Sequence, residues 1–383
     1  MESTVLVTLT LGIALQLLAA RTLTGGEYAT FVLSLAVGNI ANGIASAIQP
    51  VVALRASGDS TLAVRDLRRA IALALGVSVI AVVALSRSVG TGLAVAIGAQ
   101  LPLHALVGVG QGRIQGALRL GPLAVSISMF AVLRMLVVVP LILMGVRNVH
   151  PFVLSLPLSL AGTLTFLALI GAFDGLTRGG RGTAGRDLLG PVLAWLVFYW
   201  LLNGDAVYGR MVLNASDAGQ YAVSFTLGRL PVFLAAPLAI VLLPVMTRAD
   251  TDRRRALIEL LAVAAVLALG TALALGIVPA LPVTLLAGRS DAASDLLVRL
   301  QAWSGASAAL ALLLFTFLFA MRYMPASMVS LFIAATIVVG GTALAGSAVV
   351  LALVQAITMS VIVALLAATA WSWTRSPAVA DEA

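Results

Sequence analysis

Long apolar runs alternate with short polar or glycine- and proline-rich breaks along almost the whole chain. A run of about twenty apolar residues is long enough to span the roughly 30 Å hydrocarbon core of a bilayer as an α-helix. The run boundaries predict twelve spans, at 4–20, 28–49, 70–86, 91–110, 121–145, 151–172, 188–207, 219–246, 256–278, 293–320, 326–343 and 346–371. The pattern therefore predicts an all-α polytopic membrane protein.

Three short patterns recur in the same order in the two halves of the chain. The matches pair Gly26-x-Tyr28-Ala29 with Gly219-x-Tyr221-Ala222, Arg68-Arg69-Ala70 with Arg254-Arg255-Ala256, and Ala117-x-Arg119-x-x-Pro122 with Ala320-x-Arg322-x-x-Pro325. Each recurrence falls at the same kind of span boundary. A shared order indicates a duplicated helical unit, the usual plan of secondary transporters and flippases.

The longest stretch of low hydrophobicity between predicted spans runs from residue 173 to 187 and separates six helices from six. We therefore expect an N-terminal six-helix lobe at 1–172, a cytoplasmic linker at 173–187, and a C-terminal six-helix lobe with a short cytoplasmic tail at 188–383. An even number of spans gives both lobes the same orientation, so the predicted pseudo-twofold axis lies along the membrane normal.

Composition limits the possible chemistry and indicates how the chain is oriented in the membrane. The 23 basic residues are all arginine and there is no cysteine, which excludes lysine Schiff bases, thiol nucleophiles and disulfides. Most arginines fall in the predicted inside loops, which favours cytoplasmic termini in the cell (inner or plasma) membrane. The predicted outside loops hold only Arg21, Arg87, Arg147, Arg210 and Arg289. The net charge of +8 thus reflects topology and contact with anionic membrane lipids, and no nucleic-acid partner is expected.

Two segments carry a family resemblance. The segment from Leu17 to Phe31, LLAARTLTGGEYATF, resembles the opening of polysaccharide flippases, although Ala29 stands where that family often has glycine. The segment from Leu202 to Ala222 resembles the seventh-to-eighth helix region of the same proteins, and Pro244 resembles the proline that closes their eighth helix. The chain is similar to the oligosaccharide and polysaccharide transporter branch of the multidrug/oligosaccharidyl-lipid/polysaccharide (MOP) flippase superfamily.

This resemblance implies a MATE-like pair of six-helix lobes that alternates access to a lipid-linked glycan. It implies that an undecaprenyl-pyrophosphate-linked oligosaccharide or polysaccharide precursor passes from the inner to the outer leaflet, with no catalytic residue, cofactor or metal. The expected partners are this glycan lipid, membrane lipids, and the glycosyltransferases and polymerase of the same pathway.

Arginines inside apolar spans are the main chemical signal. Arg134 lies near the midpoint of one predicted helix, and Arg229 lies within another. A charge at such depth costs about 2.5–3.5 kcal/mol on insertion scales and normally faces a cavity or a partner. We expect both guanidinium groups to line a central cleft and bind phosphate or acidic sugar oxygens. An interhelical ion pair or a carbonyl cap is the alternative. For Arg299, pairing with Asp295 or reaching the outer headgroups is favoured.

Asp205 is the best candidate for an acid within a span, and it is the predicted ion-coupling residue if transport is coupled to a cation. The alternative is that Asp205 and Asn203 cap and orient a helix turn. His104 titrates near neutrality in water, yet a lone histidine among apolar residues is more often an interhelical hydrogen-bond donor.

Uncharged polar groups complete the predicted cleft. Asn39, Asn42 and Gln301 lie within predicted spans and are suited to binding sugar hydroxyls. The same side chains also serve as hydrogen-bonding contacts between membrane helices, worth about 0.6 kcal/mol each.

Enzyme motifs are missing from the chain. It has no GxSxG, no HExxH and no P-loop, and it has only two histidines. Two alternatives to a glycan-lipid flippase remain: a cation-coupled multidrug or small-molecule antiporter of the same superfamily, and a membrane-embedded glycan-assembly enzyme. The antiporter should carry cation-binding acids in its N-terminal lobe, and the enzyme needs sizeable outside loops. Neither feature is present.

Overall fold

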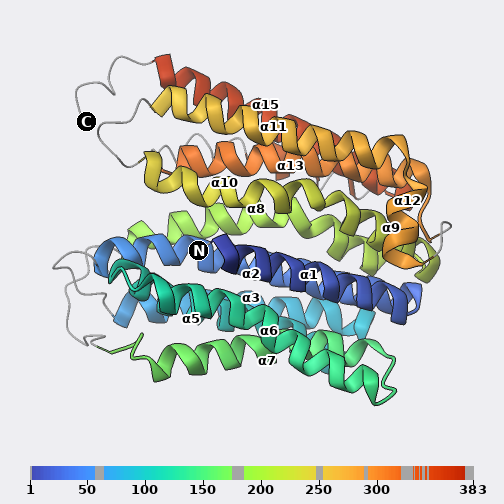
Figure 1. The fold of residues 1–383 in the computed structure, drawn as a ribbon, viewed down its shortest axis with the longest axis horizontal. Helices are drawn as coiled ribbons and strands as arrows, with labels where there is room; N and C mark the ends of the chain where they lie inside the picture. The colour runs from blue at the N-terminus through green and yellow to red at the C-terminus, as the bar shows by residue number, and fades with distance from the viewer. Residues whose placement is uncertain are drawn as a thin grey trace. The chain divides into compact units, whose positions relative to one another are not determined.

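The computed structural model is all-helical, with no strand among the residues that it describes (Figure 1). These residues are 2–56, 64–174, 185–246, 253–288, 292–320, parts of 331–342, and 345–375. The helices are α1 (Glu2–Thr22), α2 (Gly25–Ala56), α3 (Val64–Val89), α4 (Thr91–Gly98), α5 (Gln100–Gly116), α6 (Leu120–Leu143), α7 (Val149–Leu169), α8 (Gly185–Val212), α9 (Ala215–Gly228), α10 (Leu230–Met246), α11 (Arg253–Ile277), α12 (Ala280–Ala287), α13 (Asp295–Ala320) and α15 (Ala348–Arg375). The predicted all-α class is confirmed.

Nine helical segments of the described chain are long and apolar enough to cross a membrane, so this is a multi-pass membrane protein. The predicted span at 326–343 and the third repeat match at Ala320 to Pro325 lie largely outside the described residues. The total of twelve spans therefore stays a prediction.

The chain divides into two compact units, residues 1–211 and residues 212–383. The first unit contains α1 to α8, and the second contains α9 to α13 and α15. Most of the predicted linker at 173–187 lies outside the described residues, so the predicted lobe boundaries stay predictions.

The predicted span at 91–110 is interrupted at Ala99, between α4 and α5. Pro102 has no N–H group, so the carbonyl of Gly98 cannot receive its usual helical hydrogen bond. The Ser78 hydroxyl on α3 donates to this carbonyl at 2.8 Å and satisfies it. A proline break in one helix is thus stabilised by a neighbouring helix.

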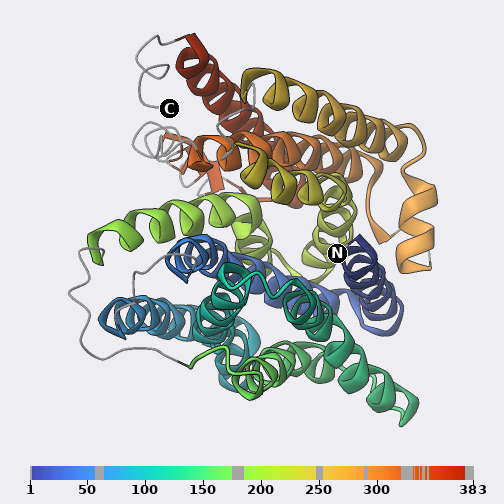
Figure 2. The same cartoon turned by 60° about the vertical axis from the view of Figure 1, so that its left-hand side comes forward.

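The short helix α12 was not predicted from the sequence. It follows α11 as a separate piece, drawn in light orange in Figure 2. Leu281 and Leu285 on it are exposed. Its apolar composition resembles that of the spans, but eight residues are too few to cross a bilayer.

Backbones approach closely where α2 packs against α5. A Cβ atom added at Gly108 would lie 2.8 Å from the Ala45 Cα, and one at Gly112 would lie 2.6 Å from the Gln49 carbonyl oxygen. Small residues four positions apart on α5 therefore let α2 pack flush against it, a common packing mode of membrane helices. The Gln49 and Gln115 side chains add a hydrogen bond of 2.9 Å.

Capping groups start the helices that carry the first repeat match in each unit. Thr24 precedes α2, and both its backbone N–H and its hydroxyl donate to Glu27, at 3.1 and 2.8 Å. Asn214 precedes α9, and its side chain accepts from the Asp217 N–H at 3.0 Å. A polar residue followed three positions later by an acid is a helix-start signal. The repeated tyrosines that follow, Tyr28 and Tyr221, are both 2% exposed.

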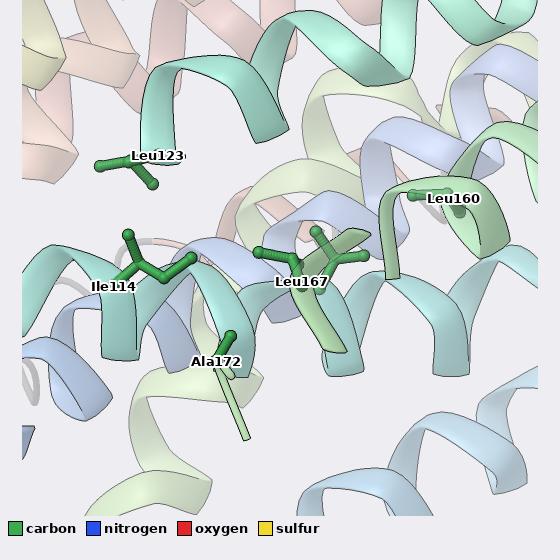
Figure 3. Packing of buried hydrophobic residues seen from close by; sticks show 6 residues of the cluster. Ile114, Leu123, Leu160, Leu167 and Ala172 are labelled. Carbon is green, nitrogen blue, oxygen red and sulfur yellow. The ribbon is translucent and has the colours of Figure 1, made fainter. Parts of the chain in front are cut away.

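An apolar cluster joins α5, α6 and α7 in the first unit (Figure 3). Its fully buried members are Val107, Ile114, Leu123, Leu160, Leu167 and Ala172. Leu103, Ile127, Phe130 and Leu164 pack against it. The cluster lies between residues 107–114 of α5, the start of α6, and the second half of α7 with the residues that follow it. It fills this part of the unit with hydrocarbon side chains.

Candidate functional site

Arg134 is the only charged residue in α6, and it is 8% exposed. Its Nε and Nη2 atoms are buried and donate no hydrogen bond to any described residue. The guanidinium carbon lies 5.5 Å from the centroid of the Phe130 ring, one helical turn earlier, within the range of a cation–π contact. An interhelical ion pair, the alternative for this residue, is not formed with any side chain that the structure describes.

The α6 face that carries Arg134 is turned toward α5. Ser126, Phe130 and Arg134 recur every four residues and so share one face of the helix. The Gln111 side chain on α5 donates to the Ser126 hydroxyl at 3.2 Å. The His104 ring on α5 meets the Phe130 ring edge-on, with centroids 6.1 Å apart. Arg134 therefore lies on the same face of α6 as Ser126 and Phe130, the two residues that contact α5.

Arg229 is a buried arginine of the second unit, at 6% exposure. It sits at the break between α9 and α10. Pro231 has no N–H group to donate to the Leu227 carbonyl, which explains why the predicted span at 219–246 is divided here. The guanidinium carbon lies 4.3 Å from the Phe225 ring centroid.

Gln301 on α13 packs directly against this break and is 1% exposed. A Cβ atom added at Gly228 would lie 2.5 Å from the Gln301 carbonyl oxygen, and one added at Gly305 would overlap the Gly228 carbonyl oxygen. The structure thus brings Gln301 next to Gly228, the residue before Arg229. Sequence reasoning missed Ser304, which is three residues after Gln301. The Gln301 Nε2 and Ser304 Oγ atoms are buried without a hydrogen-bond partner among the described residues.

Asn39 and Asn42 lie where α2 meets α8. Asn39 donates to the Asn203 side-chain oxygen at 3.3 Å, and Asn203 donates to the Tyr199 carbonyl at 3.0 Å. The Tyr199 side chain also lies near Asn42 and Ser46. Asn39 therefore joins α2 to α8, the alternative that the sequence left open. Asn42 remains exposed, and its predicted role in binding sugars stays a prediction.

Asp205 lies within α8 and is 1% exposed. It is a buried carboxylate inside a span, as the ion-coupling prediction requires. Its role is still a prediction.

Arg299 does not enter the candidate site. Its Nε donates to the Gly276 carbonyl at 3.1 Å, near the end of α11. This contact caps a helix end, and Arg299 forms no ion pair with Asp295 in the described structure. No group of three or more histidine, aspartate or glutamate side chains within the described ranges is placed to hold a metal ion.

Comparisons with known proteins place the chain by its fold. No protein-family model matches the sequence, and no curated protein matches it. Among solved structures, the lipid II flippase MurJ in an inward closed conformation aligns with a TM-score of 0.69 at 11% identity, covering 97% of this chain and 87% of MurJ. An inward-facing multidrug resistance MATE family transporter of the MOP superfamily aligns with a TM-score of 0.64 at 12% identity, covering 99% of both chains.

A third similar structure is a MOP superfamily transporter from Pyrococcus furiosus, for which a binding pocket of reversed polarity is reported to suggest a different function. It aligns with a TM-score of 0.63 at 12% identity, covering 97% of this chain and 95% of the other. The chain therefore has the two-lobed, all-helical fold of MOP and MATE transporters.

Proposed function

We propose that this protein is an alternating-access flippase that moves a lipid-linked oligosaccharide or polysaccharide precursor from the inner to the outer leaflet. The observation that carries the proposal is Arg134, a guanidinium buried in a membrane helix without a protein acceptor for Nε and Nη2. These two N–H donors form a planar fork that matches a phosphate oxygen pair. An undecaprenyl pyrophosphate headgroup supplies such oxygens.

The fold and the second buried arginine support the same proposal. MurJ, which shares the fold, is a lipid II flippase. Each unit of this chain holds a deeply buried arginine stacked on an aromatic ring, Arg134 on Phe130 and Arg229 on Phe225. In the proposed mechanism both arginines line the substrate path, which lowers the cost of bringing an anionic headgroup into the membrane.

The membrane potential is a sufficient driving force for the proposed transport. A headgroup with about two negative charges gains about 5 kcal/mol when it moves outward across an inside-negative potential of about 100 mV. No cation-binding acid is then required. The proposed location is the cell membrane with cytoplasmic termini, and the proposed partners are the glycosyltransferases and polymerase that make and use the glycan.

A cation-coupled antiporter is the second candidate, and one observation favours it. Asp205 is a carboxylate that is almost fully buried in a span, which is the kind of group that binds a coupling cation. Multidrug transporters of the MATE family share the fold. The two candidates differ in which charge is essential, the arginine or the acid.

Replacement of Arg134 by Gln tests the flippase proposal in a deletion strain complemented with each variant. Arg134→Gln should abolish surface polysaccharide while the protein level in the membrane stays near wild type. Arg147→Gln is the matched control, because Arg147 is exposed and lies in the turn between α6 and α7. Unchanged polysaccharide in the deletion strain contradicts the proposal, and loss of the Arg134→Gln protein itself indicates a structural role.

A further inference from the structure

The surroundings of Arg134 contain a second group able to carry positive charge. His104 on α5 is buried at 7% exposure and forms no hydrogen bond with the described residues. Its ring contacts the Phe130 ring on which the Arg134 guanidinium also lies. The Phe130 ring thus contacts both Arg134 and His104, and these two residues lie near the midpoints of their spans. The other histidine, His150, is exposed at the start of α7.

Arg134 and His104 form no ion pair with any carboxylate whose side chain the structure describes. In the sequence, every other charged or titratable residue of the helices that pack against α5 and α6 falls within about two turns of a helix end. The residues concerned are Glu2 and Arg21 on α1, Glu27, Tyr28 and Arg55 on α2, Arg65, Asp66, Arg68, Arg69 and Arg87 on α3, Arg113 on α5, and His150 on α7. A buried cation without a counter-charge is costly, so a ligand anion is the natural complement.

The apolar cluster of α5, α6 and α7 closes one side of this arrangement. Phe130 packs against the cluster, and Arg134 lies one turn further along α6, away from the cluster residues Leu123 and Ile127 of that helix. Hydrocarbon side chains on that side exclude water and lower the local dielectric constant. Electrostatic attraction of an anion is stronger in such surroundings than in water.

We propose that Arg134, Phe130 and His104 form an oxyanion site for a phosphate or diphosphate group within residues 1–211, where His104 takes up a proton as the anion binds. Arg134 supplies the bidentate fork through Nε and Nη2, and Phe130 holds the guanidinium in place. His104 donates through one ring nitrogen when neutral and through both when protonated. The biological meaning of the site rests on the proposed flippase function.

Proton uptake gives the site a defined pH dependence. An anion near the ring favours the imidazolium form, so the bound state holds more protons than the free state. Linkage then requires affinity to rise as the pH falls, by up to about tenfold per pH unit when one full proton is taken up. Without His104 this contribution disappears.

Calorimetric titration of the full-length protein in nanodiscs with inorganic pyrophosphate tests the site. Titrations at about pH 6 and pH 8, in buffers of different ionisation enthalpy, give both the affinity and the number of protons taken up. Arg134→Gln should weaken binding by about tenfold or more at both pH values, as expected for loss of charged hydrogen bonds. His104→Gln should abolish the excess proton uptake and flatten the pH dependence. The ionisation of pyrophosphate itself is common to all variants and cancels in the comparison.

The matched controls are Arg147→Gln and His150→Gln, which remove exposed residues of the same types and should bind like wild type. If Arg134→Gln fails to fold, Arg134→Lys keeps the charge but loses the fork and should bind more weakly than wild type. Because the chain has only two histidines, ¹⁵N-histidine spectra give a second readout. Pyrophosphate should shift the His104 signal and leave that of His150 unchanged. Equal proton uptake in wild type and His104→Gln overturns the proposal.

Nanodiscs that contain a polyprenyl pyrophosphate distinguish the two sources of the anion. Competition between this lipid and inorganic pyrophosphate identifies a lipid headgroup as the ligand. If the lipid does not compete, the ligand is a free phosphate species. The same experiments test the proposed function separately from the site. Wild-type binding that depends on Arg134 and His104, with no change of surface polysaccharide in the deletion strain, supports the site and contradicts the flippase. Loss of polysaccharide in the deletion strain without His104-dependent binding supports the flippase and contradicts the site.

Discussion

At the scale of single residues, the chain separates its intramembrane charges. Arg134 and Asp205 lie in the same unit and both are almost fully buried, yet Arg134 forms no ion pair with Asp205 or with any other described residue. Mutual neutralisation would have explained both residues as structural. Their separation means that substitution of either one tests a different transport mechanism.

Asp205→Asn separates a flippase from a cation antiporter. The substitution removes the negative charge but keeps the size of the side chain and one of its two acceptor oxygens. A glycan-lipid flippase driven by the membrane potential depends on cationic residues, so we expect Asp205→Asn to retain partial export. Surface polysaccharide and drug susceptibility would be measured together in the complemented deletion strain. Hypersensitivity of the deletion strain to cationic drugs that Asp205→Asn fails to correct, with polysaccharide unchanged, would favour the antiporter.

How far the sequence predicts the site depends on the residue. Burial of Arg134 and Arg229 follows from charge inside an apolar helix, and their aromatic partners four residues earlier lie at a helical spacing that can be read directly. Helix neighbours cannot be read in this way. The contacts of Asn39 with Asn203 and of Phe130 with His104 depend on which helix faces which.

At the scale of helices, close backbone packing holds α13 against the break between α9 and α10. Both breaks in predicted spans occur just before a proline, at Pro102 and Pro231, so the sequence contained a signal for each. Hydropathy over a span-length window averages such a break away. It also averages away the short helix α12, which therefore became visible only in the structure.

Gly305→Ala should destabilise the protein strongly, because the added methyl group would overlap the Gly228 carbonyl oxygen. Overpacking of this kind costs about 1–3 kcal/mol, and a rigid backbone neighbour places the cost at the upper end. The apparent Tm of the detergent-purified protein and its level in the membrane would be measured. Gly270→Ala on α11 is the control, because a methyl group there meets nothing within 4 Å. Equal thermal stability of the two variants would show that the close contact is not required.

At the scale of the whole molecule, the fold class was predictable because twenty-residue apolar runs have few structural solutions in a membrane. The repeat matches add the prediction of a duplicated unit. Tyr28 and Tyr221, which the first match pairs, are equally buried on helices with similar capped starts. Substrate identity was not predictable in this way, because related folds carry different substrates.

The repeat predicts how the two halves are related. An experimental structure should superimpose residues 1–172 on residues 188–383 by a rotation about the membrane normal, with Tyr28 placed on Tyr221. A count of six spans in each half should accompany this symmetry. An inverted relation between the halves, or an odd number of spans in either, contradicts the prediction.

The predicted topology is open to direct labelling, because the chain contains no cysteine. Leu118 and Met144 are exposed at opposite ends of α6. With cytoplasmic termini, a membrane-impermeant maleimide added to intact cells should label Met144→Cys and not Leu118→Cys. Permeabilised cells provide the control, in which both variants should be labelled. The reverse pattern in intact cells would invert the assignment.

The apolar cluster beside Arg134 also determines where a voltage acts. An applied potential falls mainly across regions without water or mobile ions, and the cluster of α5, α6 and α7 is such a region. The cluster lies on the predicted cytoplasmic side of Arg134, so an anion that comes from the inner leaflet passes these hydrocarbon side chains first and crosses part of the electric field before it reaches Arg134. The remaining part acts on the step from Arg134 to the outer leaflet. Together the two steps cross the whole field. Membrane voltage would therefore govern the occupancy of the site as well as the direction of transport.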